Sequence, residues 1–267
     1  MDFAKGHGTG NDFVIVADPD GARPLSAREV ATLCDRHFGI GGDGLLRVVR
    51  AAKHPESVDL ADRAEWFMDY HNADGGIAEM CGNGVRVFAR YLVDNGLADG
   101  DVIPVATRAG LREVTATGDG FAVDMGPARV GGGGTATLEG EVFSGIRVSM
   151  GNPHLVCRVD DPSALDLHRA PIVDASVFGD GVNVEFIAGD AESIAMRVHE
   201  RGVGETLSCG TGACAAAAVA LGGKGTCVVR VPGGEVAVTV TDDTTILAGP
   251  AVIVAYGRTN LLASASG

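Results

Sequence analysis

Lysine is the scarcest charged residue in this sequence, and basic residues as a group are outnumbered by acidic ones. Only three lysines occur in 267 residues, and 21 Lys and Arg against 35 Asp and Glu give a formal net charge of −14. This balance argues against nucleic acid or an anionic membrane as a partner, because both attract basic surfaces. Aromatic residues are few as well, at 5%, but the apolar fraction of 46% is that of a globular protein with a filled core.

Long hydrophobic runs are also missing. No segment approaches the roughly 18 apolar residues that a membrane-spanning helix needs, and residues 1–12 lack the basic-then-apolar pattern of a signal peptide. We therefore expect a cytoplasmic protein whose six cysteines stay reduced and form no disulfide framework. The length allows one large domain or two of moderate size.

Three motifs occur twice, in the same order along the chain. They are a Gly-Asn turn before an apolar run, a Phe-Gly loop, and Cys-Gly-x-Gly, at residues 10–16 and 151–157, 38–44 and 178–181, and 81–84 and 209–212. Three matches in one order are typical of a duplicated domain. The repeats predict two halves, residues 1–118 and residues 119–250, with the tail 251–267 crossing back to the first half.

Apolar periodicity predicts a sheet and one long helix in each half. Residues 85–95 carry apolar residues at helical spacing, and residues 213–221 are almost all alanine and valine, which predicts a helix buried on most sides. A further helix is expected at residues 27–37 after Ser26 as its N-cap, and the glycines at 131–134 are expected to form a linker-like loop. Strands are expected at 13–17, 45–49, 65–70, 102–107, 111–116, 120–125, 146–149, 155–159, 182–187, 195–199, 226–231, 235–241 and 251–255. The fold class predicted is α+β, with two pseudo-symmetric domains, each a mostly antiparallel sheet wrapped around a central helix, and the active site at the domain interface.

Two cysteines, Cys81 and Cys209, stand directly before Gly-x-Gly at the start of the two predicted central helices. A helix N-terminus offers N–H groups and a partial positive charge, so it binds anions and can lower the pKa of a thiol. The glycines let a ligand approach the backbone closely. A tight helix entry with an inert cysteine would explain one such motif, but two at equivalent positions indicate a function.

Two opposed thiols around one bound anion suit the inversion of a stereocentre. One thiol would take a proton from one face of a carbon while the other delivers a proton to the opposite face, and the helix ends would stabilise the charge that an α-carboxylate gains. Pyridoxal phosphate, the usual alternative, needs a Schiff-base lysine. Lys53 and Lys224 lie in no recognisable cofactor motif and Lys5 is only near the first glycine loop, so we expect chemistry without a cofactor.

The other cysteines are expected to be core residues, because each lies in apolar periodic surroundings. These residues are Cys34, Cys157, Cys214 and Cys227. The pair Cys209 and Cys214, with His199 nearby, has C-x4-C spacing and no second pair follows, so it does not match a structural zinc site. No metal is therefore expected.

The chain resembles diaminopimelate epimerases throughout its length, and the two cysteine blocks are the most specific part of the match. The matching segments are residues 8–13, 72–75, 79–84, 151–154, 183–186 and 200–213. The resemblance implies an isomerase, independent of cofactors, that converts LL-2,6-diaminopimelate to meso-diaminopimelate for lysine and peptidoglycan precursor biosynthesis. It also implies that the protein forms a homodimer and that its ligand is this small-molecule substrate.

The resemblance implies a role for each matched residue. Cys209 would be the base for the LL substrate and Cys81 the acid, with the roles exchanged in reverse, while His154 and Glu200 would tune the pKa values of the two thiols. The reacting carboxylate would be held by the backbone amides of Gly82, Asn83, Gly210 and Thr211. The amino groups and the distal carboxylate would be bound by Asn11, Asn72, Asn152, Asn183, Glu200 and Arg201. Turn chemistry alone is the alternative explanation for the four asparagines.

One position departs from the family's pattern, and three other functions compete with the epimerase. Many members have glutamine where this chain has Gly44, so we expect that substrate contact to be absent or to be replaced by backbone or water. A proline or hydroxyproline racemase of similar fold is expected to have histidine in place of Asn83. A redox protein that joins Cys81 and Cys209 in a reversible disulfide would leave Arg201 and the asparagines unexplained. An amino-acid-binding module would bind diaminopimelate without exchanging its α-hydrogen.

Overall fold

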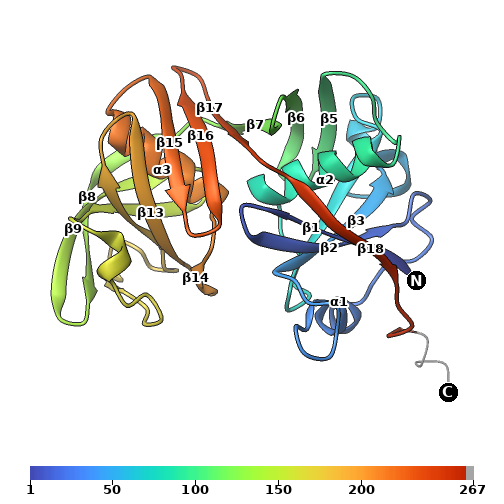
Figure 1. The fold of residues 1–267 in the computed structure, drawn as a ribbon, viewed down its shortest axis with the longest axis horizontal. Helices are drawn as coiled ribbons and strands as arrows, with labels where there is room; N and C mark the ends of the chain where they lie inside the picture. The colour runs from blue at the N-terminus through green and yellow to red at the C-terminus, as the bar shows by residue number, and fades with distance from the viewer. Residues whose placement is uncertain (263–267) are drawn as a thin grey trace. The chain divides into compact units, whose positions relative to one another are not determined.

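The computed structural model describes residues 1–262, and these form two compact units. One unit contains residues 1–123 together with the described residues from 250 onward, and the other contains residues 124–249. Each unit is a mixed sheet around one helix (Figure 1), and most of its strand pairings are antiparallel. The predicted α+β class with two domains of like design is confirmed.

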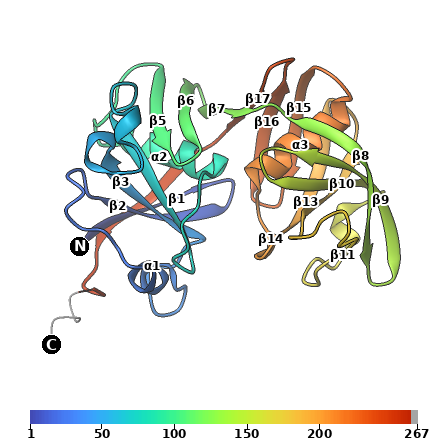
Figure 2. The same cartoon turned by 180° about the vertical axis from the view of Figure 1, so that it is seen from behind.

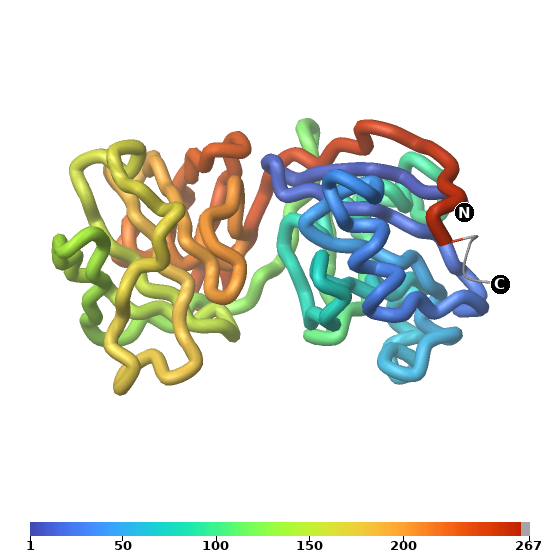
Figure 3. The backbone as a smooth tube through the Cα atoms, turned by 90° about the horizontal axis from the view of Figure 1, so that it is seen from below, coloured from blue at the N-terminus to red at the C-terminus, as the bar shows by residue number. Residues whose placement is uncertain are grey.

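The sheet of the first unit follows the order β18–β1–β2–β3–β4–β5–β6–β7. The pairs β2–β3 and β4–β5 are parallel and the others are antiparallel. The strands are β1 (Asp2–Gly8), β2 (Asn11–Ala17), β3 (Gly44–Arg50), β4 (Trp66–Asn72), β5 (Val102–Thr107), β6 (Gly110–Thr117), β7 (Gly120–Gly126) and β18 (Val252–Arg258). Figure 3 shows β18, near the C-terminal end, running beside the N-terminal strands. The predicted returning tail extends to residue 267, and its part from 263 to 267 lies outside the described residues.

The central helix of the first unit is α2 (Gly82–Asp94), which contacts β1 to β6 and β18. Its apolar face, including Val85, Phe88 and Leu92, is fully buried, as the helical spacing predicts. A second helix, α1 (Ala27–Cys34), packs on β2 and β3, and short 3-10 turns cover Ala51–Lys53 and Val58–Leu60. Helix α1 ends earlier than predicted because Asp35 is extended and its carboxylate binds the next backbone N–H groups, which competes with helix continuation.

The second unit repeats this arrangement of strands with the order β8–β9–β10–β12–β13–β15–β16–β17. The pairs β10–β12 and β13–β15 are parallel and the others are antiparallel, so parallel pairs occupy the same places as in the first unit. The strands are β8 (Arg129–Leu138), β9 (Glu141–Ser149), β10 (Pro153–Arg158), β12 (Asn183–Gly189), β13 (Ser193–Glu200), β15 (Gly225–Val231), β16 (Gly234–Val240) and β17 (Thr245–Gly249), with the short β11 (Ile172–Val173) on β8 and β14 (Gly204–Thr206) on β13. A single 3-10 turn, Pro162–Ala164, is described in this unit.

Helix α3 (Gly210–Leu221) is the centre of the second unit and contacts all eight strands of its main sheet (Figure 2). Its residues from Ala213 to Ala217 are at most 1% exposed, because alanine side chains allow strands to pack close on every side of the helix. The predicted burial of this helix is therefore confirmed. No helix among residues 1–262 is long and apolar enough to cross a membrane.

The expected loop at residues 131–134 is wrong, because these glycines lie within strand β8. Gly133 and Gly134 pair with β9, and Gly131 and Gly132 lie in the register shift between Val130 and Gly133. A Cβ at Gly134 would lie 3.0 Å from Leu155 and 3.2 Å from Phe178. Glycine at this position lets the strand pack against the core of the unit, and composition alone does not distinguish this use from a linker.

Candidate active site

Cys81 is the N-cap residue of α2 and is partly exposed. Its thiol donates a hydrogen bond to Asn11 Oδ1 at 3.5 Å, and the same oxygen accepts from Asn83 Nδ2 at 3.3 Å. The first turn of a helix offers N–H groups and a positive dipole end to an anion. The sequence prediction of a thiol beside an anion cradle is therefore compatible with the geometry of this unit.

Asp43 determines which end of the Asn11 amide faces the thiol. Asn11 Nδ2 donates to Asp43 Oδ2 at 2.8 Å, and the other carboxylate oxygen accepts from Arg36 at 2.7 Å. Because an ionised carboxylate can only accept hydrogen bonds, the amide nitrogen turns to Asp43 and the amide oxygen turns to Cys81. Sequence reasoning missed this role of Asp43, although the residue lies in the repeated glycine loop at 38–44.

Asn72 is the exposed last residue of β4 and pairs with Gly44 at the start of β3. A Cβ at Gly44 would lie 2.6 Å from the carbonyl oxygen of His71 and 2.7 Å from Tyr70 Cε2. The neighbouring strand therefore occupies the space of any side chain at position 44. A glutamine at position 44 would therefore place its Cβ against the backbone of β4.

The substitution Gly44→Ala is expected to lower the free energy of unfolding by roughly 1–3 kcal/mol, because the added methyl group overpacks the contact with β4. Gly118→Ala is the matched control, because a Cβ there has no atom within 4 Å, and its effect is expected to stay within about 0.5 kcal/mol. Urea unfolding measures both. Equal stability of the two variants would contradict the steric explanation.

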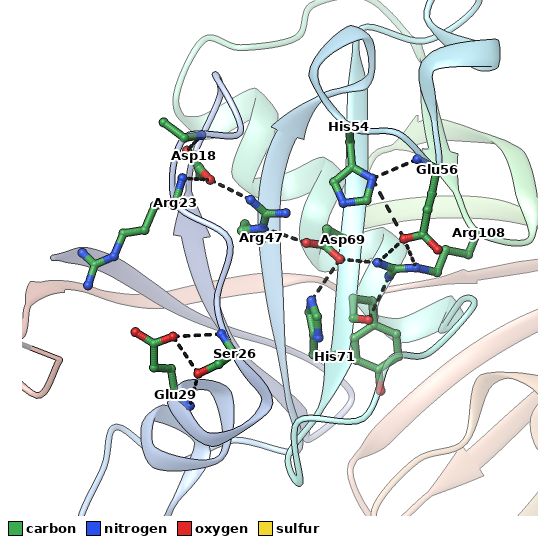
Figure 4. A network of polar contacts seen from close by, with 12 residues as sticks. Asp18, Arg23, Ser26, Glu29, Arg47, His54, Glu56, Asp69, His71 and Arg108 are labelled. Carbon is green, nitrogen blue, oxygen red and sulfur yellow. Dashed lines mark hydrogen bonds and ion pairs between the residues drawn. The ribbon is translucent and has the colours of Figure 1, made fainter. Parts of the chain in front are cut away.

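A buried polar network anchors the strand that carries Asn72 (Figure 4). Asp69, also on β4, accepts from Arg47 at 2.7 Å and from Arg108 at 2.6 Å, and its carboxylate lies 3.0 Å from His71 Nε2. Burial pushes the pKa of Asp69 upward, but the bonds and charges of His71, Arg108 and Arg47 outweigh this effect and hold it well below its usual value. The end of β4 is therefore held by charge-assisted bonds that need an ionised Asp69.

Cys209 is the N-cap residue of α3 and is buried, at 7% exposure. Its sulfur accepts a hydrogen bond from the Gly212 backbone N–H at 3.4 Å and lies 3.5 Å from Thr211 Oγ1. The carboxyl group of Glu200, at the end of β13, lies close enough to Cys209 for the two groups to affect each other's pKa. The second cysteine thus starts the central helix of its unit as Cys81 does, in a more enclosed setting.

The carboxyl groups around Cys209 oppose its ionisation. Burial raises the pKa of Cys209 well above its usual value, and Glu200 and Glu185 raise it further, while the bonds from Thr211 and Gly212 lower it. Burial also raises the pKa of Glu200, against the lowering effect of its hydrogen bonds. A carboxyl group of raised pKa close to a thiol is a suitable acceptor for the thiol's proton.

A chain of hydrogen bonds leads from His154 towards Thr211. His154, on β10, is fully buried, and its Nδ1 lies 2.6 Å from Glu185 Oε1 on β12. Its Nε2 lies 3.0 Å from Asn152 Oδ1, and Asn152 Nδ2 lies 3.4 Å from Thr211 Oγ1. Sequence reasoning missed Glu185, although a carboxyl group within the apolar run at 182–187 was a usable signal.

Asn183 and Arg201 are linked through the backbone. Asn183 Oδ1 accepts from the Arg201 backbone N–H at 2.9 Å, and its Nδ2 donates to the Pro153 carbonyl at 3.0 Å. The Arg201 residue is exposed, and Nη1 reaches the Asp180 carbonyl at 3.5 Å. Asn183 therefore joins β10 and β12 to the segment that presents the Arg201 guanidinium.

The remaining cysteines have the character expected of core residues. Cys34, Cys157, Cys214 and Cys227 are each at most 3% exposed. Burial raises the pKa of Cys34 to about 11 and that of Cys157 to about 12, so both remain protonated near neutral pH. Among residues 1–262, no group of three or more His, Cys, Asp or Glu side chains is arranged to hold a metal ion.

The predicted site residues form two groups, one in each unit, each centred on the start of the central helix. The first unit holds Cys81, Gly82, Asn83 and Asn11, with Asn72 at the end of β4. The second unit holds Cys209, Gly210, Thr211, Asn152, His154 and Glu200, with Asn183 and Arg201 at the ends of β12 and β13.

Comparison with known proteins gives a consistent result over nearly the whole chain. The sequence profile described as diaminopimelate epimerase matches residues 3–131 and 146–258. The chain is 53% identical to the diaminopimelate epimerase of Thermobifida fusca (strain YX), covering 98% of this chain and 99% of that protein. It is 49% identical to the diaminopimelate epimerase of Corynebacterium glutamicum, covering 97% of this chain and 98% of that protein.

Solved structures of lower identity share the fold. A phenazine biosynthesis protein of the PhzF family from Bacillus anthracis matches with a TM-score of 0.69 at 16% identity, covering 97% of this chain and 98% of that chain. A hydroxyproline epimerase from Agrobacterium vitis with bound trans-4-hydroxy-L-proline matches with a TM-score of 0.64 at 15% identity, covering 96% and 91%. At these identities the likeness concerns the arrangement of strands and helices only.

Proposed function

The chain belongs to the diaminopimelate epimerase family, and we propose that it interconverts LL- and meso-2,6-diaminopimelate with two cysteines and no cofactor. The observation that carries this proposal is the repeated geometry in which a cysteine caps the central helix of each unit. A duplicated thiol at a duplicated anion cradle suits a reaction whose substrate and product differ only in the configuration of one carbon.

In the direction from LL to meso, Cys209 acts as the base and Cys81 as the acid. Glu200 accepts the proton of the Cys209 thiol, and the resulting thiolate takes the α-proton of the substrate. Cys81, whose thiol donates to Asn11 Oδ1 and is therefore held as a thiol, gives its proton to the opposite face of the α-carbon. In the reverse direction the two sulfurs exchange roles.

The two helix starts stabilise the charge that develops when the α-proton leaves. The electron pair spreads onto the α-carboxylate, which we place against the backbone amides at the two N-termini, so that the charge grows where N–H groups and helix dipoles already point. These amides belong to Gly82, Asn83, Gly210 and Thr211.

The remaining polar residues bind the rest of the substrate. The amide and carboxylate oxygens of Asn11, Asn72, Asn152 and Glu200 suit its ammonium groups, and the Arg201 fork can bind both oxygens of the distal carboxylate. Asn183 contributes by fixing the backbone of Arg201. We further propose that the enzyme acts as a homodimer in the cytoplasm, where cysteines stay reduced; sedimentation tests the oligomeric state.

An exchange assay tests the function. The purified chain, with EDTA and no added pyridoxal phosphate, is incubated with LL-diaminopimelate in deuterated water and followed by proton NMR. The expected result is loss of the α-hydrogen signal together with appearance of the meso isomer. Binding of diaminopimelate without deuterium incorporation would assign the chain to an amino-acid-binding function instead.

A further inference from the structure

Glu185 is a buried carboxyl group beside Cys209 that no step of the proposed reaction uses. Its side chain has no exposed surface, and its Oε2 has no hydrogen-bond partner among the described residues. A Cβ at Gly212 would lie 2.7 Å from Glu185 Oε1, so the glycine in the first turn of α3 leaves the space that this carboxyl group fills. Burying such a group is costly unless it is paired, which makes its contacts informative.

The hydrogen bonds between Glu185 and Cys209 all run in one direction. Asn152 Oδ1 can only accept, so the His154 Nε2 that lies 3.0 Å away carries a hydrogen. His154 Nδ1 lies 2.6 Å from Glu185 Oε1, a distance that requires one proton between them. Asn152 Nδ2 donates to Thr211 Oγ1, and the hydroxyl hydrogen of Thr211 is then directed to Cys209 Sγ at 3.5 Å.

We propose that Glu185 is a positioning residue, which shares a proton with His154. This proton fixes the direction of the hydrogen bonds from His154 through Asn152 to Thr211, so that the Thr211 hydroxyl donates to the Cys209 sulfur. The inference rests on the proposed function, in which the Cys209 thiolate removes the α-proton. The pair holds two protons, one on Nε2 and one shared, and is neutral as a whole. If the pair loses one proton, the remaining proton moves to Nδ1, where it bonds to the ionised Glu185 carboxylate. A bare Nε2 then faces the Asn152 oxygen, and the amide must turn over.

A purely electrostatic role for Glu185 predicts the opposite effect on Cys209. The titratable groups facing the sulfur are Glu185 from β12 and Glu200 from β13, with His154 on β10 behind them, and α3 contains no charged residue. The Glu185 charge raises the pKa of the thiol, so its removal alone would make Cys209 more reactive. In the proposed network its removal leaves the tautomer of His154 and the orientation of Asn152 unfixed, so the Thr211 hydroxyl is no longer held as a donor to the thiolate and Cys209 becomes less reactive.

The variants Glu185→Met and Glu185→Gln separate these roles, with Glu235→Gln as a control at an exposed ion pair of the same unit. Methionine cannot donate to His154, so kcat is expected to fall about tenfold, with a smaller change in KM. Alkylation of Cys209 by iodoacetamide, followed by peptide mass spectrometry from pH 6 to 9, is expected to slow. Glutamine can donate to Nδ1 and keep the hydrogen on Nε2, so both rates are expected to stay within about threefold of the unsubstituted enzyme. Faster alkylation in Glu185→Met, or equal losses in the two variants, would overturn the proposal.

A measurement on the unsubstituted protein keeps the proposal testable if Glu185→Met does not fold. Nitrogen NMR of histidine-labelled protein, with the ring assigned by comparison with His154→Gln, is expected to show a protonated Nε2 and a strongly hydrogen-bonded Nδ1 at neutral pH. An unprotonated Nε2 would overturn it. This signal needs no substrate, so absence of α-hydrogen exchange in the unsubstituted protein would disprove the epimerase function separately.

Discussion

Replacing Cys81 by serine is expected to lower inversion of LL-diaminopimelate by about 10²–10⁴-fold while leaving exchange of its α-hydrogen with solvent. Cys209 can still remove the α-proton, pass it to Glu200 and return a solvent-derived deuteron to the same face. Cys209→Ser is expected to lose both inversion and exchange with the LL substrate, because its base is missing. Proton NMR in deuterated water separates the two events by isomer and by deuterium content.

The meso substrate provides the reciprocal result and Cys227→Ala the control. Starting from meso-diaminopimelate, Cys209→Ser is expected to retain exchange at the invertible carbon and Cys81→Ser to lose it. Cys227, fully buried in β15, takes no part in the proposed chemistry, and its alanine variant is expected to invert within about threefold of the unsubstituted rate. Inversion at the full rate by either serine variant would rule out the two-cysteine mechanism.

Residues of the candidate site could be proposed from the sequence where the residue type and its local motif are enough to suggest a role. Cys81 and Cys209 stand in a repeated block whose glycines and following helix are visible in the sequence. Asp43 and Glu185 were not found, because each acts through a contact with a residue at least 30 positions away, and only the fold creates those contacts. Local patterns therefore identify candidates for the chemistry, and the tertiary structure identifies the groups that orient those candidates.

The fold was predictable to a similar degree and for a similar reason. Helices α2 and α3 follow from apolar spacing and from an alanine-rich run, both of which are local signals. Strand β1 was not expected, because its two glycines interrupt the apolar pattern, and the glycines of β8 were read as a loop. Strand β1 pairs with β18, which is distant in the chain, and β8 pairs with β9 across a hairpin. Amino-acid composition does not encode such pairings.

Replacing Asp69 by asparagine is expected to lower the free energy of unfolding by about 3–5 kcal/mol, because it removes the carboxylate that two buried guanidinium groups share. The side chain of Asp69 is 2% exposed, that of Arg47 is 5% exposed and that of Arg108 is 9% exposed. Arg47 keeps Asp18, at 2.7 Å, and Arg108 keeps Glu56, at 2.8 Å, so the fold is weakened and not lost. Asp242→Asn, at an exposed ion pair with Lys224, is the control and is expected to change stability by less than about 1 kcal/mol.

The effect of Asp69→Asn is expected to shrink as the pH falls. The pKa of Asp69 is lowered in the folded state, whereas the unfolded chain has an ordinary value of about 3.9. Its stabilisation is therefore complete above about pH 5 and is lost progressively as the pH falls below about 4 towards the folded pKa, because the unfolded chain takes up the proton first. Urea unfolding of both proteins at pH 7, 5 and 3 measures this difference, and other acidic groups cancel because both proteins share them. If the two proteins differed in free energy of unfolding by the same amount at pH 3 and pH 7, the lower stability of Asp69→Asn would come from packing and not from the ionised carboxylate. In that case β4 and its terminal Asn72 would not depend on charge for their position.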